Sequence, residues 1–320
     1  MPGSDAILIV ADPVRTINPL TNDTDPDGDA PLTVTGAANG AKGTVGFTGT
    51  SVTYTAATLG TGMDTFTYTV SDGFGDSATG TVKVYSIGAQ AGFYSGLIEN
   101  AGSADGASQI AMNTSGALTW RIHFGGLKYS FKGQVDDNGG ATIQISRSNQ
   151  ALARLHLALV PGDAPIFHVE VEQNGTTAGT GEAEHSGTNT PGRRRYTLLL
   201  PPDPAQAASD AIPQGTGFAR VSFSAKGEIS IAGATGDGAR FSTASAVRTD
   251  NTFPFFAPIY GIPRGELYGT LTIRDVPGVS DLDGVLTWNK HLQRHPTRIG
   301  PASFTTTPQP SAHATCSRSR

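Results

Sequence analysis

Asp64-Thr-Phe-Thr-Tyr-Thr-Val70, followed by Ser71-Asp72-Gly73, is the stretch that decides the fold of the N-terminal part of the chain. Apolar or aromatic residues alternate with threonine along it, which is the pattern of a strand with one buried face. The Asp-Gly pair that follows favours a turn. The stretch therefore predicts a half-buried strand that ends in a turn.

Strands of the same kind flank this stretch on both sides. The predicted strands of this part are residues 6–10, 14–17, 32–35, 43–47, 51–55, 64–70 and 78–84. Seven short strands at this spacing predict a Greek-key sandwich of immunoglobulin type over residues 1–87.

An acidic loop, Asn22-Asp-Thr-Asp-Pro-Asp-Gly-Asp29, interrupts these strands. The carboxylates of Asp23, Asp25, Asp27 and Asp29 fall on alternate residues, and like charges this close repel unless a cation neutralises them. Ca²⁺ prefers a flexible set of oxygen ligands, so the loop predicts a calcium site. The alternative is a solvated turn whose aspartates cap backbone N–H groups.

The acidic loop, Leu32-Thr-Val-Thr35, Val52-Thr-Tyr-Thr55 and residues 64–73 together resemble the bacterial cadherin-like, immunoglobulin-like tandem repeats. Such repeats occur in large surface and secreted proteins, where they act as calcium-stiffened stalk and adhesion modules. The resemblance covers about the first quarter of the chain, in a single copy, whereas the family usually strings copies together. It implies that Asp72, in the Ser-Asp-Gly turn, belongs to the same calcium site as the acidic loop.

The composition narrows the functional class. The chain has 320 residues, of which 15% are charged, and a net charge of −5, which argues against a nucleic-acid-binding protein. The single cysteine, Cys316, excludes an intramolecular disulfide. No apolar run is long enough for a transmembrane helix, and the N-terminus does not resemble a signal peptide. We expect a piece of a longer exported protein at the cell surface or outside the cell, with other surface-protein domains or cell-surface glycans as partners.

Residues 88–290 predict a second β-rich domain. Its predicted strands include 117–124, 129–133, 141–146, 154–160, 166–172, 195–200, 217–223, 228–231 and 266–273. No stretch has sustained helical periodicity, so the region predicts an up-and-down barrel or a large sandwich, and the whole chain is predicted to be all-β. The region resembles the domain that often follows such repeats in surface proteins of environmental bacteria, for which we know no activity.

Two further groups of residues have both a structural and a functional interpretation. His168, Glu170 and Glu172 alternate with valines on one strand, which is typical of a wet outer sheet face and, with His156, also of a zinc site. The aromatic residues of segment 253–260 favour a core, and an exposed ligand surface for a sugar ring or a peptide is the alternative. That segment contains Phe253, Phe255, Phe256 and Tyr260.

Residues 291–320 predict a disordered tail, because they are polar and basic, rich in proline and threonine, and contain no acidic residue. A frameshifted end of the reading frame is the alternative hypothesis. No catalytic motif occurs in the chain. The sequence therefore predicts a calcium-stabilised structural or adhesion module that is not an enzyme. A carbohydrate-binding module is the alternative, and a hydrolase on a β-scaffold is a weaker one.

Overall fold

The computed structural model describes residues 1–28, 31–60, 62–145, 153–187, 194–201, 215–225, 227–260, 265–276, 280–290 and 316–318. The structure is all-β, as predicted. Within these ranges the only helical elements are two 3₁₀ turns, η1 (Pro19–Thr21) and η2 (Ile87–Gln90). No helix in the described part of the chain is long and apolar enough to cross a membrane.

The N-terminal residues form two sheets that face each other in a sandwich. One has the order β1-β7-β6-β3 and the other the order β2-β5-β4. The bounds are β1 Ser4–Ile9, β2 Val14–Ile17, β3 Thr33–Ala38, β4 Gly43–Phe47, β5 Val52–Ala56, β6 Asp64–Ser71 and β7 Ser77–Ser86. Strands β1 and β7 pair in parallel, whereas β6–β7, β3–β6, β2–β5 and β4–β5 pair antiparallel. Each of the seven predicted strands is present.

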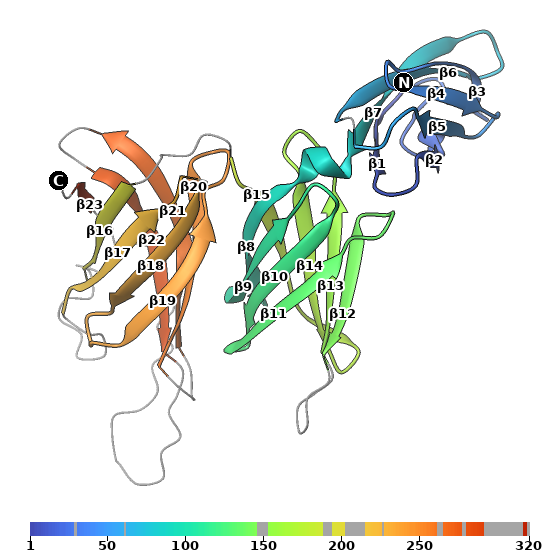
Figure 1. Ribbon diagram of the computed structural model, residues 1–320. Helices are drawn as coiled ribbons and strands as arrows, with labels where there is room; N and C mark the ends of the chain where they lie inside the picture. Colours follow the sequence, from blue (N-terminus) through green and yellow to red (C-terminus); the bar gives the residue numbers. More distant parts are fainter. Residues whose placement is uncertain are drawn as a thin grey trace. The chain divides into compact units, whose positions relative to one another are not determined.

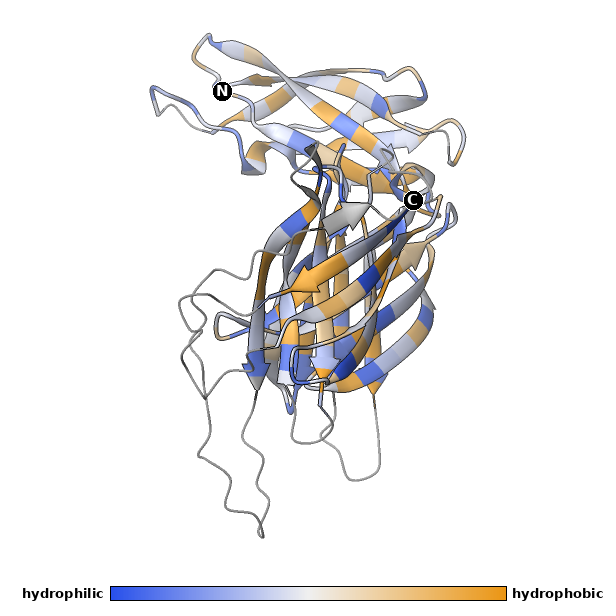
Figure 2. Cartoon of the chain, turned by 90° about the vertical axis from the view of Figure 1, so that its left-hand side faces the viewer, coloured by the Kyte–Doolittle hydropathy of each residue, from blue (hydrophilic) through white to orange (hydrophobic). Residues whose placement is uncertain are grey.

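The alternating pattern of these strands accounts for the core of the sandwich. In β6 every second residue from Asp64 to Val70 is buried, while the threonines between them are exposed or half-buried. Figure 2 shows the same alternation of apolar and polar residues along the strands. The buried side chains of both sheets form one cluster: Ile7, Ile9, Val34, Val52, Tyr54, Phe66, Tyr68, Val70, Val82 and Val84.

An eight-stranded sheet follows, with the order β11-β10-β9-β8-β15-β14-β13-β12 (Figure 1). The bounds are β8 Gly92–Asn100, β9 Ser103–Met112, β10 Ala117–Phe124, β11 Leu127–Gln134, β12 Gly140–Ile145, β13 Ala153–Val160, β14 Ile166–Gln173 and β15 Thr176–His185. Apart from β8 and β15, all neighbours are consecutive in the chain. The two edge strands, β11 and β12, are also consecutive, so this is the predicted up-and-down arrangement in a nearly closed form.

Residues from 194 onward form two more sheets. One has the order β19-β18-β17-β16-β23 and the other the order β20-β21-β22. The bounds are β16 Arg194–Leu200, β17 Gly217–Phe223, β18 Glu228–Ala234, β19 Arg240–Ala246, β20 Thr252–Ile259, β21 Gly265–Val276, β22 Ser280–Lys290 and β23 Cys316–Arg318. Residues of both sheets share one buried cluster, and hydroxyls of β19 bond to carbonyls of β20.

The disorder predicted for residues 291–320 stays a prediction. Within this segment the structure describes only strand β23, which pairs antiparallel with β16. The rest of segment 291–320 lies outside the described residues.

By its internal contacts the chain divides into two compact units. The first comprises residues 1–92, 111–119 and 131–168, and the second comprises residues 93–110, 120–130 and 169–320. The N-terminal sandwich therefore belongs to the same unit as the β12–β13 hairpin.

Candidate metal centre

Asp23 makes more hydrogen bonds than the other described carboxylates of the acidic loop. One of its oxygens accepts a 2.7 Å hydrogen bond from the backbone N–H of Gly3. The hydroxyl of Tyr68, a core residue of β6, lies 3.0 Å from both oxygens of Asp23 and 3.2 Å from an oxygen of Asp5. Asp5 of β1 and Asp23 of the acidic loop thus meet at one phenol.

The electrostatics of this group favour a positive charge nearby. Burial raises the pKa of Asp5, the hydrogen bond from Tyr68 opposes that rise, and the charge of Asp23 adds to it. Burial raises the pKa of Tyr68 strongly, and the hydrogen bond to Asp23 raises it further, so the phenol is a permanent donor. A bound cation would offset the repulsion between Asp5 and Asp23.

In the same loop Asp25 is half-buried and Asp27 is exposed. An oxygen of Asp25 accepts a 2.9 Å hydrogen bond from the backbone N–H of Asp27, which forms a local turn around Pro26. Gly28 follows with φ of +81°, a left-handed conformation that glycine adopts without strain. These contacts use one oxygen of Asp25, and the carboxylate of Asp27 makes no hydrogen bond or ion pair with any described residue.

Asp72 organises the turn that follows β6. One of its oxygens accepts hydrogen bonds from the N–H groups of Phe74, Gly75 and Asp76, at 2.7, 3.1 and 3.2 Å. The bond from Phe74 is the largest influence and lowers the pKa of Asp72 below its usual range. Asp72 thus has a structural role in its own turn, whether or not it also binds a cation.

The structure does not assemble these aspartates into a complete metal site in the part that it describes. Among those residues no group of three or more histidine, cysteine, aspartate or glutamate side chains is placed to hold a metal ion. Asp29, the last carboxylate of the predicted site, lies outside the described residues. The calcium site therefore stays a prediction, and the N–H-capping roles of Asp25 and Asp72 are observed.

Asp64, at the start of β6, is a structural carboxylate. It is 8% exposed and accepts hydrogen bonds from the N–H groups of Ala41 and Lys42, both at 2.9 Å. The hydroxyl of Tyr54 donates a third, at 2.8 Å. Burial alone would raise the pKa of Asp64, but these donors outweigh it and lower the pKa.

The burial of the aromatic segment 253–260 contradicts the hypothesis that it forms a ligand surface. Phe253 and Phe255 are completely buried, and Phe256 is 5% exposed. The first two belong to the core cluster shared by the last two sheets, where Phe255 packs edge-on against Phe241. Only Tyr260 is half-exposed, and its hydroxyl bonds to Asp237. The core interpretation is therefore confirmed for Phe253 and Phe255, which alternate along β20 and so share its inner face. Phe256 lies at the next position, and its ring packs edge-on against His123.

The histidine cluster has the burial pattern of an outer sheet face. On β14 the side chain of His168 is exposed, while Val169 and Val171 are buried. Glu170 accepts a 2.5 Å hydrogen bond from Thr177 of the neighbouring strand. These observations agree with the interpretation of His168, Glu170 and Glu172 as residues of a solvent-facing sheet surface.

Sequence reasoning missed Asp5 as a partner of Asp23. Asp5 lies 18 residues away in a strand that begins the chain, and no local motif marks it. Its position follows from the parallel pairing of β1 with β7, in which Asp5 is opposite Val82. The sequence signal that could have indicated Asp5 is its position as an acidic residue directly before the apolar run Ala6-Ile-Leu-Ile-Val10.

Comparison with known proteins identifies the N-terminal domain. Residues 2–85 match the family model of the bacterial Ig domain, which confirms the predicted resemblance for this part of the chain. Domains of this family usually occur in surface proteins and are typically non-catalytic. The match therefore favours a structural or adhesion-type module. A search of curated proteins and a search of solved structures found no match.

Proposed function

We propose that this chain is a structural module of a bacterial surface protein, in which the Ig domain is a rigid spacer for the β-barrel that follows it. The observation that carries this proposal is a set of polar contacts between the Ig domain and two turns of the eight-stranded sheet. All of these contacts lie within the first compact unit.

The β11–β12 turn contacts the β1–β2 region of the Ig domain. One oxygen of Asp137 accepts hydrogen bonds from the backbone N–H groups of Ala11 and Asp12, at 3.1 and 3.3 Å. These bonds lower the pKa of Asp137, which Arg15 lowers further. Gly139 of the same turn packs against Leu8, because a Cβ at position 139 would lie 3.0 Å from a Leu8 methyl carbon.

The β13–β14 turn contacts the end of β7 and the η2 turn. The ammonium of Lys83 lies 2.8 Å from a carboxylate oxygen of Asp163, and the hydroxyl of Tyr85 donates to the other oxygen at 3.2 Å. The side-chain carbonyl of Gln90, a buried residue, accepts a 3.0 Å hydrogen bond from the N–H of Gly162. Two separate turns thus restrain the end of the Ig domain.

Two points of attachment support a spacer better than a flexible tether. A single contact leaves a domain free to rotate about it, whereas contacts with two different turns restrict that rotation. The join between β7 and β8 is also short and structured, since η2 occupies it and Ile87 is buried. A rigid join suits a stalk that holds a binding surface away from the cell.

Calcium at the acidic loop is part of the same proposal. The ligands would be Asp23, Asp25, Asp27, Asp29 and Asp72, and the cation would stiffen the loop and join it to the β6–β7 turn. The nearness of Asp5 to Asp23 supports it: the charge of Asp23 adds to the rise that burial causes in the pKa of Asp5, and a cation would offset the repulsion between the two carboxylates. Extracellular modules of this kind bind calcium weakly, with Kd of about 10⁻⁴–10⁻³ M.

The experiment that tests the spacer compares the wild-type chain with the Asp137→Ala/Asp163→Ala variant. Spin labels at exposed positions in the Ig domain and in β12 would report the distribution of distances between them by pulsed electron resonance. A single narrow distribution is expected for the wild type and a broad one for the variant. Surface labelling of intact cells of the source bacterium would test the location.

A matched control removes a carboxylate that makes no such contact. Asp76→Ala is suitable, because the side chain of Asp76 is exposed and has no hydrogen bond or ion pair with any described residue. It should leave the distance distribution unchanged. A broad distribution in the wild type, or the absence of the protein from the cell surface, would contradict the proposal.

A further inference from the structure

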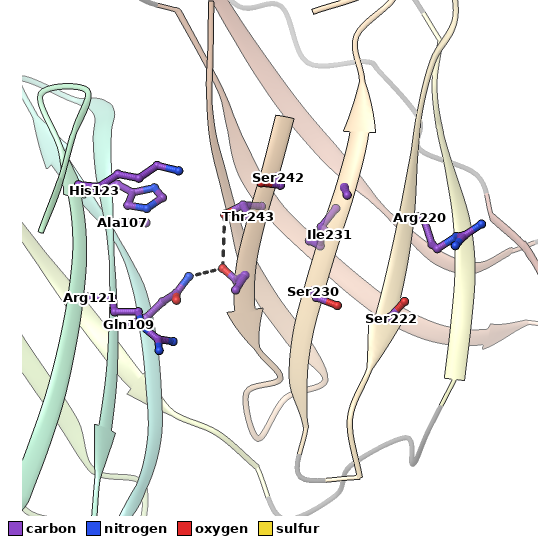
Figure 3. Close-up of a pocket in the computed structure, with 13 residues that line it drawn as sticks. Ala107, Gln109, Arg121, His123, Arg220, Ser222, Ser230, Ile231, Ser242 and Thr243 are labelled. Atoms are coloured by element: carbon purple, nitrogen blue, oxygen red, sulfur yellow. Dashed lines mark hydrogen bonds between the residues drawn. The ribbon is translucent and has the colours of Figure 1, made fainter. Parts of the chain in front are cut away.

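A cavity of about 430 Å³ lies in the second compact unit. Its lining comes from β9, β10 and β11 on one side and from β17, β18 and β19 on the other (Figure 3). This volume is within the range of small-molecule sites, about 300–1,000 Å³. The Ig domain contributes nothing to it, so it is separate from the acidic loop.

The lining of this cavity is strongly basic. Arg121, Lys128 and Arg220 line it together with His123, and none of its thirteen lining residues is acidic. The chain as a whole has a net charge of −5, so the cavity has the opposite sign to the rest of the molecule. A concentration of one sign of charge in a concave site attracts ligands of the other sign.

The three cations have no partner in the described part of the chain that neutralises them. Elsewhere in the structure, cations are paired: Lys83 with Asp163 and Arg248 with Glu184, for example. No hydrogen bond or ion pair of Arg121, Lys128 or Arg220 is found among the described residues. Their guanidinium and ammonium donors are therefore available to an anion.

Cross-strand pairing builds one wall of the cavity from small polar side chains. Ser222 of β17 is opposite Ser230 of β18, and Arg220 is opposite Ala232. Ala232 in turn is opposite Ser242 of β19. Side chains at alternate positions share one face of a sheet, so this wall presents hydroxyls beside an arginine. Small residues here leave the space that larger ones would fill.

The opposite wall contains a neutral imidazole as well as two cations. Arg121 and His123 are two residues apart on β10 and so share its outer face, while buried Trp120 and Ile122 point the other way. Burial lowers the pKa of His123 to about 4, and the charge of Lys128 lowers it further. His123 is therefore a neutral hydrogen-bonding group at pH 7, and the positive charge comes from Arg121, Lys128 and Arg220.

We propose that this cavity binds an acidic saccharide, a sugar that carries carboxylate or sulfate groups. Arginine recognises such groups with two parallel hydrogen bonds, and serine and threonine hydroxyls can pair with sugar hydroxyls. The lining contains no phenylalanine, tyrosine or tryptophan on which a nucleobase or an uncharged sugar ring could stack. This inference does not depend on the spacer role.

Isothermal titration of the full chain tests the proposal. The probes are a digalacturonate and a sulfated heparin-type disaccharide, with maltose as the uncharged sugar and sodium sulfate as the free anion. We expect saturable binding of at least one acidic disaccharide and none of maltose. Sodium sulfate at the same concentration should bind at least ~10-fold more weakly than the acidic disaccharide, because it cannot use the hydroxyl wall.

Variants assign the binding to this cavity. Arg121→Gln/Arg220→Gln should weaken binding at least ~10-fold, since it removes two charge-assisted contacts. Arg240→Gln is the matched control, because Arg240 is an exposed arginine of β19 that does not line the cavity. Ser230→Leu should weaken binding by filling space without a change of charge. Ser230 is exposed, so this variant is expected to fold.

Three results would overturn the proposal. The first is the absence of binding of both acidic disaccharides. The second is an equal loss of affinity in Arg240→Gln, which would mean attraction by the overall charge only. The third is sulfate binding as tight as that of the disaccharides, which would mean a site for free anions. Shifts of the His123 ring signals on titration, in NMR spectra, would support binding in the cavity itself.

Discussion

The hydroxyl of Tyr54 donates a 2.8 Å hydrogen bond to a carboxylate oxygen of Asp64 inside the Ig domain. Tyr54 is 2% exposed, and its ring stacks on Phe66 with a centroid distance of 5.6 Å. Asp64 in turn holds the backbone N–H groups of Ala41 and Lys42. One pair of side chains thus ties β5, β6 and the β3–β4 connection together.

Tyr54→Phe should destabilise the protein by about 1–3 kcal/mol, because it leaves a buried carboxylate without one of its donors. Urea unfolding would measure the change as a lower midpoint with an unchanged slope. Adding Asp64→Asn completes a double-mutant cycle, in which the two changes should be less than additive. Additive effects would show that the hydrogen bond does not couple the two residues.

Gly80→Ala should destabilise the Ig domain by about 1–3 kcal/mol, as overpacking does. Gly80 is opposite Tyr68 in the β6–β7 register, and a Cβ there would lie 2.3 Å from the ring carbon that bears the hydroxyl. Gly46→Ala is a matched control in β4, because a Cβ at position 46 would meet nothing within 4 Å. Thermal unfolding of both variants separates the contact with Tyr68 from a general effect of glycine replacement.

Asp72 should contribute stability that depends on pH in the acid range. Its folded pKa is depressed, chiefly by the hydrogen bond from Phe74, so its contribution is complete above the unfolded pKa of about 3.9 and is lost as the pH falls through the folded value. Asp72→Asn should therefore make the midpoint temperature less dependent on pH between about 2 and 4. An unchanged pH dependence in this variant would contradict the role of the carboxylate.

Asp5→Asn should raise the stability of the protein at pH 7 when calcium is absent. The folded pKa of Asp5 is raised, first by burial, so the ionised carboxylate costs free energy at pH values above it. Below the unfolded pKa the carboxyl is neutral in both states, and the gain should disappear. Thermal unfolding at pH 7 and at pH 3 checks both signs, and a loss of stability at pH 7 would contradict the expectation.

Calcium should raise the thermal midpoint of the full chain relative to EDTA. The gain follows from mass action, with about 2.7 kcal/mol expected at 100 times Kd. The Asp25→Asn/Asp27→Asn variant should lose this response, whereas Asp76→Asn should keep it. A midpoint that does not respond to calcium in the wild type would leave the loop with only its observed turn contacts.

The strands and their buried faces could be predicted from the sequence, because the alternation of side chains along a strand is a local property. In β6 the pattern of Phe66, Tyr68 and Val70 against threonines decides which face meets the core. The same reasoning explains why Phe253 and Phe255 lie in a core and not on a surface. The acidic loop was visible for a similar reason, since four carboxylates in eight residues form a local pattern.

Only the tertiary structure decided which polar residues meet. Asp5 meets Tyr68 because β1 and β6 both pair with β7, and Asp23 reaches the same hydroxyl from the acidic loop. Asp137 meets Ala11 across 126 residues of chain. Arg121 and Arg220 likewise line the same basic cavity although they are 99 residues apart in the chain, because the fold brings their strands to it. The sequence itself determined an all-β protein with one bacterial Ig domain and an acidic loop. Contacts between distant residues depend on register and sheet order, which no local pattern encodes.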